Sequence, residues 1–185
     1  MTIIELLIAM TVLTVGMLGS IVMILTGMQS NSRNKNDTSA VVLDQEILEK
    51  FTTLKNYPKS GTANIYDCSL NGLYQASLIQ GPGPNGNGAA LYTDGNAPMP
   101  TQVGDIDWTQ PAPTLATATT AGYAMRYQTC NGDIYEVRWN IMEVNPNPRS
   151  RISLLTVSAR QVAAQGNRNG MLFAVPTTLR TLIEN

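Results

Sequence analysis

A single carboxylate lies in the long apolar stretch at the start of this chain. Glu5 is the only charged side chain among residues 1–28, which read MTIIELLIAMTVLTVGMLGSIVMILTGM. A helix of this length spans about 42 Å, enough to cross a bilayer. Because an unpaired carboxylate in hydrocarbon costs about 2.5–3.5 kcal/mol, we expect Glu5 to have a cationic partner. The nearest candidate is the amine of Met1, and a neighbouring copy offset along the helix axis offers it in a better geometry than the same chain does.

An ordinary membrane anchor or a signal peptide with a stray glutamate is the alternative interpretation of this segment. A signal peptide begins with basic residues and ends at a small-residue cleavage site. The first Lys or Arg of this chain is Arg33, which lies after the apolar stretch. The segment therefore lacks the basic start of a signal peptide, which favours a helix that is retained.

The only two cysteines, Cys68 and Cys130, follow the apolar segment in the part of the chain that would be exported. An even number of cysteines in an exported domain indicates a disulfide. The alternative is a pair of free, buried thiols in a cytosolic protein. That alternative would hold only if the apolar segment did not direct export.

The sequence lacks histidine and the common nucleotide-binding motifs. The chain contains no histidine, which excludes Ser–His and Cys–His nucleophilic sites and His-ligated metal centres. The glycine-rich stretch at 81–88 has interleaved prolines and no following helix, so it matches neither phosphate-binding nor dinucleotide-binding motifs. A formal net charge of −1 provides no basic field for nucleic acid. We expect no enzymatic activity, no cofactor and no nucleic-acid partner.

Three weaker patterns are present in the polar part of the chain. Four side chains could supply oxygen ligands to calcium, although turn-forming Asp and Asn explain them better: Asp94, Asn96, Asp105 and Asp107. Asn36 begins an N-glycosylation acceptor pattern, and Thr114–Thr120 could carry O-linked sugar. Four arginines could form a basic patch but are better explained as a solvated face: Arg149, Arg151, Arg160 and Arg168.

Four regions must position these groups. The sequence predicts an apolar half of a long helix at 1–28, an amphipathic half at 29–56, a loop-rich region at 57–122 and an antiparallel sheet at 123–185. The amphipathic half has one apolar stripe, with charged residues at the remaining positions, Asp44 among them. The stripe consists of Leu43, Ile47, Phe51 and Leu54. Pro58 ends the helical pattern.

Alternating β-branched and aromatic residues predict the strands. The main ones are Tyr123–Cys130, Ile134–Val144, Arg151–Val162 and Met171–Val175, with short strands at Ile65–Cys68 and Leu73–Leu78. Asn131–Asp133 is a hairpin signal. The tail Thr177–Ile183 could be a strand or a short helix. We expect three or four antiparallel strands whose apolar face, containing Val137 and Trp139, packs on the helix stripe.

The first seven residues, Met1-Thr2-Ile3-Ile4-Glu5-Leu6-Leu7, resemble the mature N-terminus of type IV pilins. That pattern is an apolar residue, Thr or Ser, two aliphatic residues, Glu at the fifth position and a long aliphatic helix. The run Val15–Gly19 resembles the branch that contains minor pilins, and the resemblance covers about the first 55 residues. Major pilins usually begin with Phe and have a proline in the apolar segment, where this chain has Met1 and Val22.

This resemblance implies an α+β type IV pilin fold and a structural role in a pilus-like filament, or fimbrium. It implies a basic leader cut just before Met1 by a prepilin peptidase, methylation of the new amine, storage in the inner membrane and transfer by the pilus assembly machinery. The filament of identical copies and other pilins would lie on the cell surface. An initiator methionine is a second possible origin of Met1. Gly16 and Gly19 lie where relatives' helices lose regular hydrogen bonding in filaments, although this helix could stay continuous.

Three other functions remain open. Within the same family the chain could be a minor, priming pilin or a type II secretion pseudopilin. From a different class, it could be a singly anchored cell-surface binding protein that never polymerises. A second copy of the chain, offset along an axis, would separate filament subunits from the anchored protein.

Overall fold

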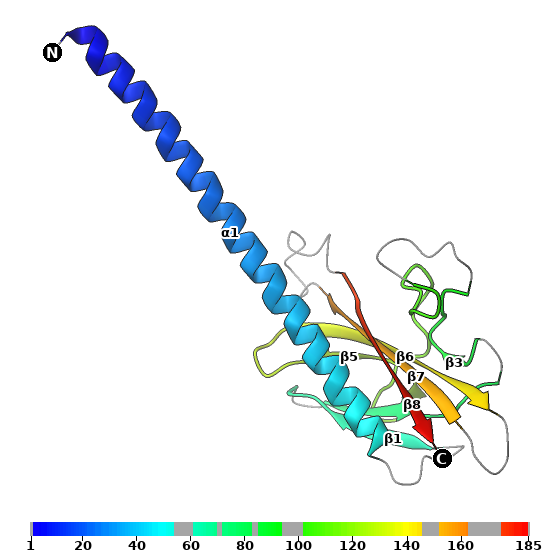
Figure 1. Cartoon of the computed structure of the whole chain (residues 1–185). Helices are drawn as coiled ribbons and strands as arrows, with labels where there is room; N and C mark the ends of the chain where they lie inside the picture. Colours follow the sequence, from blue (N-terminus) through cyan, green and yellow to red (C-terminus); the bar gives the residue numbers. More distant parts are fainter. Residues whose placement is uncertain are drawn as a thin grey trace. The chain divides into compact units, whose positions relative to one another are not determined.

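The computed structural model describes residues 2–53, 61–69, 72–82, 85–93, 102–145, 152–162 and 175–184. It is an α+β structure with one long helix and an antiparallel-rich set of strands (Figure 1). The elements in chain order are α1 (Ile3–Thr52), β1 (Thr62–Tyr66), β2 (Leu73–Ser77), β3 (Asn87–Gly88), β4 (Ala121–Gly122), β5 (Ala124–Gln128), β6 (Ile134–Asn145), β7 (Ile152–Val162) and β8 (Thr177–Glu184). The α+β prediction is thereby confirmed.

The chain divides into two compact units, Met1–Asn36 and Asp37–Asn185. Helix α1 belongs to both units and stays regular through the polar residues 29–40. Its observed end at Thr52 precedes the predicted end, and residues 54–60, with Leu54 and Pro58, lie outside the described residues. We describe each unit by itself.

Two sheets form the second unit. One has the order β1-β2-β4, with β1 antiparallel to β2 and β4 parallel to it. The other has the order β3-β6-β7-β8, and β5 pairs with the same β6. This second sheet has five strands, more than the three or four that we predicted, because β3 and β8 add to the central strands.

The predicted strand positions agree with the structure in most places. Strands β1, β2, β5, β6 and β7 lie within a few residues of their predicted bounds. The predicted hairpin turn lies between β5 and β6, where Gly132 has a φ of +88° that favours glycine. The tail from Thr177 forms strand β8, which settles the choice between strand and helix. Residues 171–174 of a further predicted strand lie outside the described residues.

The hydrophobic core of the second unit lies between the end of α1 and one face of the five-stranded sheet. Figure 1 shows the cyan part of α1 across strands β5 to β8. Leu43, Ile47 and Phe51 are buried in the same cluster as the inward residues of β6 and β7. Phe51 packs edge-on against Trp139, with ring centroids 5.5 Å apart. The predicted packing of the helix stripe on the sheet is therefore observed.

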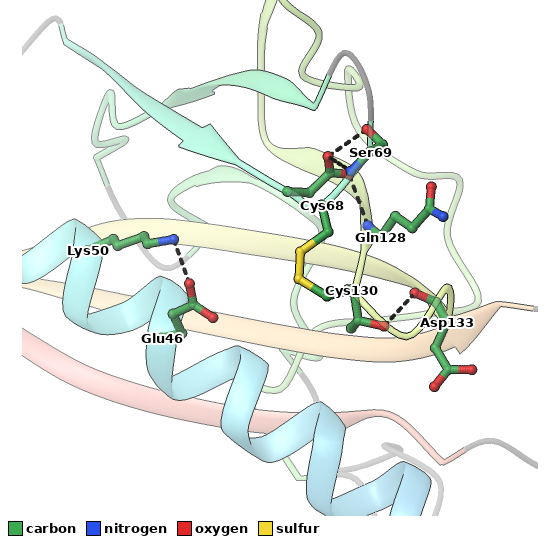
Figure 2. Close-up of a disulfide and its surroundings, with 9 residues drawn as sticks. Glu46, Lys50, Cys68, Ser69, Gln128, Cys130 and Asp133 are labelled. Atoms are coloured by element: carbon green, nitrogen blue, oxygen red, sulfur yellow. Dashed lines mark hydrogen bonds and ion pairs between the residues drawn. A yellow bond between two sulfur atoms is a disulfide. The ribbon is translucent and has the colours of Figure 1, made fainter.

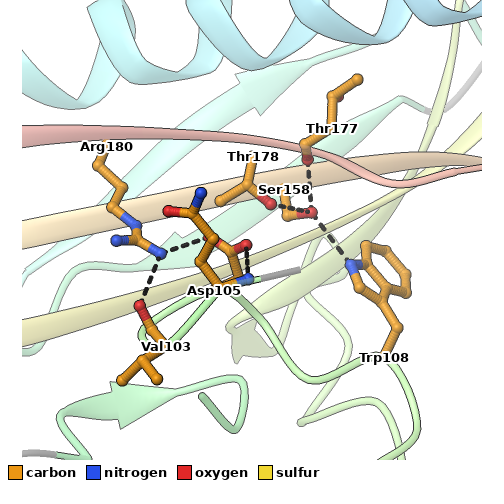
Figure 3. Close-up of polar contacts among 8 residues, drawn as sticks. Val103, Asp105, Trp108, Ser158, Thr177, Thr178 and Arg180 are labelled. Carbon is orange, nitrogen blue, oxygen red and sulfur yellow. Dashed lines mark hydrogen bonds and ion pairs between the residues drawn. The ribbon is translucent and has the colours of Figure 1, made fainter. Parts of the chain in front are cut away.

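The opposite face of this sheet is covered by the irregular segment 102–116. Trp108 of this segment lies 4.3 Å from the guanidinium of Arg138 and 4.4 Å from that of Arg160, measured to its ring centroid. Its indole N–H donates to Ser158 Oγ at 3.0 Å (Figure 3). The Arg138 guanidinium donates to the Gln110 carbonyl at 2.9 Å. The loop-rich region is therefore packed where it meets the sheet, and Arg160 lies against Trp108 instead of in a solvated patch.

Candidate functional site

The apolar part of α1, Ile3–Met28, is long and apolar enough to cross a membrane. Its 26 residues span about 39 Å as a helix. Every side chain from Thr2 to Met28 is exposed in the single chain. A signal sequence near an N-terminus can have the same length and apolar composition. The segment is thus an apolar surface that suits a membrane or another apolar helix.

The hydroxyl groups of this segment are satisfied within the helix itself. All four side-chain hydroxyls between Ile3 and Met28 donate to a backbone carbonyl three or four residues earlier: Thr11, Thr14, Ser20 and Thr26. Such local bonds remove the cost of placing a hydroxyl in hydrocarbon. Glu5 is therefore the only side chain in the segment that carries a charge, and no hydroxyl there is left without a hydrogen bond.

Glu5 is also part of the cap of α1. The helix begins at Ile3, so Thr2 is its N-cap residue and Glu5 is its third helical residue. The Thr2 backbone N–H donates to Glu5 Oε2 at 3.0 Å, which is one half of a capping box. The Thr-x-x-Glu spacing of the sequence carries this signal, and we did not derive the cap from it. The bond occupies one of the two carboxylate oxygens.

The predicted partner of Glu5, the Met1 amine, lies outside the described residues. The two glycines that could weaken the helix are described, and α1 runs unbroken through Gly16 and Gly19. A shallow apolar depression lies beside Gly16, lined by Val12, Leu13, Met17, Ser20 and Ile21. Neither glycine has an atom within 4 Å of an added Cβ, so both leave open space on the helix surface.

Cys68 and Cys130 form the predicted disulfide, with their Cα atoms 4.9 Å apart (Figure 2). Cys68 follows β1 and Cys130 follows β5, so the bond joins the two sheets. Beside it, Asp67 accepts hydrogen bonds from the Ser69 N–H and hydroxyl at 2.9 and 2.6 Å and from the Gln128 N–H at 3.0 Å. Burial alone would raise the pKa of Asp67, but these bonds and one from Tyr74 hold it below its ordinary value.

The two described calcium candidates have other partners. Asp105 accepts from the Gln102 N–H at 2.7 Å and pairs with Arg180 of β8 (Figure 3). Asp107 accepts from the N–H and the hydroxyl of Thr109 at 2.8 and 2.6 Å, an arrangement typical of an Asx turn. No group of three or more metal-ligating side chains occurs among the described residues.

Five other predicted positions lie outside the described residues. These are the calcium candidates Asp94 and Asn96 and three arginines, Arg149, Arg151 and Arg168. Asn36 lies within α1, but its side chain is not described. In the Thr-rich stretch, all four threonines are exposed: Thr114, Thr117, Thr119 and Thr120.

Asp44 departs most from its predicted place. We assigned it to the charged side of the helix, but it is 0% exposed. Its Oδ2 accepts from the Thr177 hydroxyl at 2.7 Å, and Oδ1 has no hydrogen-bond partner. Burial raises the pKa of Asp44 from 3.8 to about 7, against the opposing effects of the Thr177 hydroxyl and the nearby Ala159 backbone. Its spacing four residues after the buried Ala40 was the signal that we missed.

Comparisons of the chain with protein-family models, with curated proteins and with solved structures found no match.

Proposed function

We propose that this chain is a structural subunit of a type IV pilus-like filament. The observation that carries the proposal is an exposed apolar helix segment, Ile3–Met28, whose only charge is a carboxylate at the fifth residue. The pilin-like order of residues 1–7 and the disulfide-linked sheets after the helix support the same function. The subunit would wait in the inner membrane and then leave it for an extracellular filament with copies of itself and other pilins.

Assembly would exchange one apolar environment for another. The apolar side chains of Ile3–Met28 leave lipid and pack on the same segment of neighbouring copies, so little hydrophobic free energy separates the two states. The charge of Glu5 then decides whether the membrane state or the filament state has the lower free energy. A carboxylate in hydrocarbon is costly, and the N-terminal amine of a neighbouring copy removes that cost only in the filament.

A pair of substitutions at Glu5 separates charge pairing from helix capping. Glu5→Leu removes the charge and the acceptor for the Thr2 N–H, whereas Glu5→Gln removes only the charge. If charge pairing drives assembly, both variants insert in the membrane but give few filaments. Glu5→Asp gives an intermediate yield because its carboxylate reaches less far. The measurement is electron microscopy of sheared surface filaments, with the chain identified by mass spectrometry and membrane insertion checked by fractionation.

Met23→Leu is the matched control, because it changes an exposed apolar side chain of the same segment without changing charge. It should leave the filament yield normal. A normal yield from Glu5→Leu would overturn the proposal. Normal filaments from Glu5→Gln combined with loss in Glu5→Leu would assign Glu5 to capping alone.

The same preparation of sheared surface filaments also distinguishes the three alternative functions. A chain that forms only a small fraction of the filament mass would be a minor, priming pilin. A chain found only in short periplasmic assemblies would be a pseudopilin. The singly anchored binding protein would stay in the membrane as one copy, with no filament and no contact with a second copy.

A further inference from the structure

We infer that Asp44 is a proton-controlled clamp between α1 and the C-terminal strand β8, closed when its carboxyl is protonated. The observations that carry this inference are its complete burial and its contacts. Asp44 lies on the core-facing stripe of α1, among Ala40, Leu43 and Ile47. Its carboxyl reaches Thr177, the first residue of β8. This contact ties the start of β8 to the helix, beside the backbone pairing of β8 with β7.

The charged form of Asp44 is poorly compensated where it lies, because the carboxyl is fully buried and has one side-chain hydroxyl as its donor. As a carboxylate, Asp44 accepts from the Thr177 hydroxyl at 2.7 Å and leaves Oδ1 buried with no partner. As a carboxylic acid, Asp44 can donate to Thr177 Oγ1, and that hydroxyl can then donate to the Ala159 carbonyl, 3.4 Å away. A buried oxygen that carries charge without a partner is costly. The geometry therefore favours the acid.

No described cation compensates the Asp44 charge. On β7, Arg160 lies on the other face of the sheet, against Trp108 and near Glu136. On β8, Arg180 pairs with Asp105. On α1, Lys50 pairs with Glu46 at 2.6 Å, and Asp37 and Glu49 are exposed acids. The tyrosines of the neighbouring strands, Tyr127 and Tyr135, have their pKa values raised by burial and do not titrate near neutral pH.

The sign of the pH dependence follows from these pKa values. The unfolded carboxyl titrates near 3.9, whereas burial raises the pKa of Asp44 to about 7 in the folded chain. Between these values the folded chain holds a proton that the unfolded chain lacks, so raising the pH favours unfolding. The stabilisation is present in acid and is lost as the pH rises through about 7. Since the chain has no histidine, no ordinary imidazole titration overlaps this range.

The test is denaturant unfolding of the whole chain in detergent micelles at pH 5, 6, 7 and 8, followed by tryptophan fluorescence. Both tryptophans, Trp108 and Trp139, lie in the second unit, so the signal reports on that unit. The unfolding equilibrium constant of the unchanged chain should rise by up to about tenfold per pH unit between pH 5 and 7 and then level off. Asp44→Asn, which is neutral at every pH, should abolish this dependence.

Two further variants and one direct measurement complete the test. Glu46→Gln removes an exposed carboxylate two residues away and should keep the dependence. Thr177→Val removes the hydroxyl that stabilises the carboxylate and should move the upper end of the dependence to higher pH. Hydrogen exchange of the unchanged chain should show β8 amides losing protection relative to β6 amides as the pH rises. Equal stability at pH 5 and 8, or unchanged relative protection of β8, would overturn the inference even if a variant failed to fold.

Discussion

At the residue scale, the two acids Glu5 and Asp44 of α1 have opposite surroundings. Glu5 is exposed in the first turn of α1, where its Oε2 accepts from the Thr2 N–H at 3.0 Å. Asp44 is buried in the C-terminal part of α1, which ends at Thr52, and accepts from the Thr177 hydroxyl, with no cation of the described residues beside it. The two carboxyl groups therefore differ in burial, and burial raises the pKa of Asp44.

Truncation of Phe51 should lower the free energy of unfolding of the second unit. It is fully buried, and its ring packs on Trp139. Phe51→Ala should lower the free energy of unfolding by about 3–5 kcal/mol, from lost burial and the cavity left behind. Val42→Ala, on the same helix but 56% exposed, should change it by less than about 0.5 kcal/mol. Tryptophan-monitored denaturation at constant pH measures both, and equal effects would contradict this packing.

At the scale of elements, the segment 102–116 covers one face of the five-stranded sheet, and Trp108 is its aromatic contact with that face. Trp108→Ala removes contacts with two guanidinium groups and the bond to Ser158. We expect a loss of about 2–3 kcal/mol in unfolding free energy, from cation–π contacts and apolar burial. Trp108→Phe keeps a ring but not the N–H, and should lose about 1 kcal/mol.

The measurement for these variants is denaturation followed by the fluorescence of Trp139, the tryptophan that remains. Hydrogen exchange should increase for backbone N–H groups of 102–116 that bond to other loops, such as those of Gly104 and Asp107. Unchanged exchange in Trp108→Ala would show that other contacts, such as Asp105 with Arg180, hold the segment alone.

The elements differed in how far the sequence predicted them. Period-two alternation placed β6 and β7, because one face of each strand is buried by the helix. The same reasoning misplaced Asp44, since charge outweighed its position on the apolar stripe. The cover at 102–116 has no periodicity, and its anchors join residues far apart in the chain, Trp108 with Ser158 and Arg138 with Gln110. Such long-range pairs leave no local pattern.

At the scale of the whole molecule, the two units differ in how their apolar side chains are covered within a single chain. The second unit buries its apolar residues in its own core, whereas the apolar side chains of Ile3–Met28 are exposed. A soluble monomer rarely exposes so large a continuous apolar surface. The first unit therefore needs a membrane or other helices around it, which agrees with the proposed storage in a membrane and assembly in a filament.

The second unit is held together by the disulfide as well as by its core. The bond between Cys68 and Cys130 closes a loop with a sequence separation of 62 and joins the end of β1 in one sheet to the end of β5 in the other. The chain-entropy model gives about 4 kcal/mol for a loop of this size. The double variant Cys68→Ser with Cys130→Ser should lose about that much unfolding free energy in guanidinium denaturation.

The loss should be uneven across the second unit. The amides of β1 and β2, short strands next to the disulfide, should lose more protection from hydrogen exchange than those of β6 and β7, which pair along most of their length. Asp67→Asn is the matched control, because it removes the charge beside the bond but leaves the disulfide intact. It should weaken the same region less than the double cysteine variant does. Equal denaturation midpoints for the reduced and oxidised chains would mean that the core and the Cys68 N–H bond to the Gln128 carbonyl, 3.1 Å long, suffice to join the two sheets.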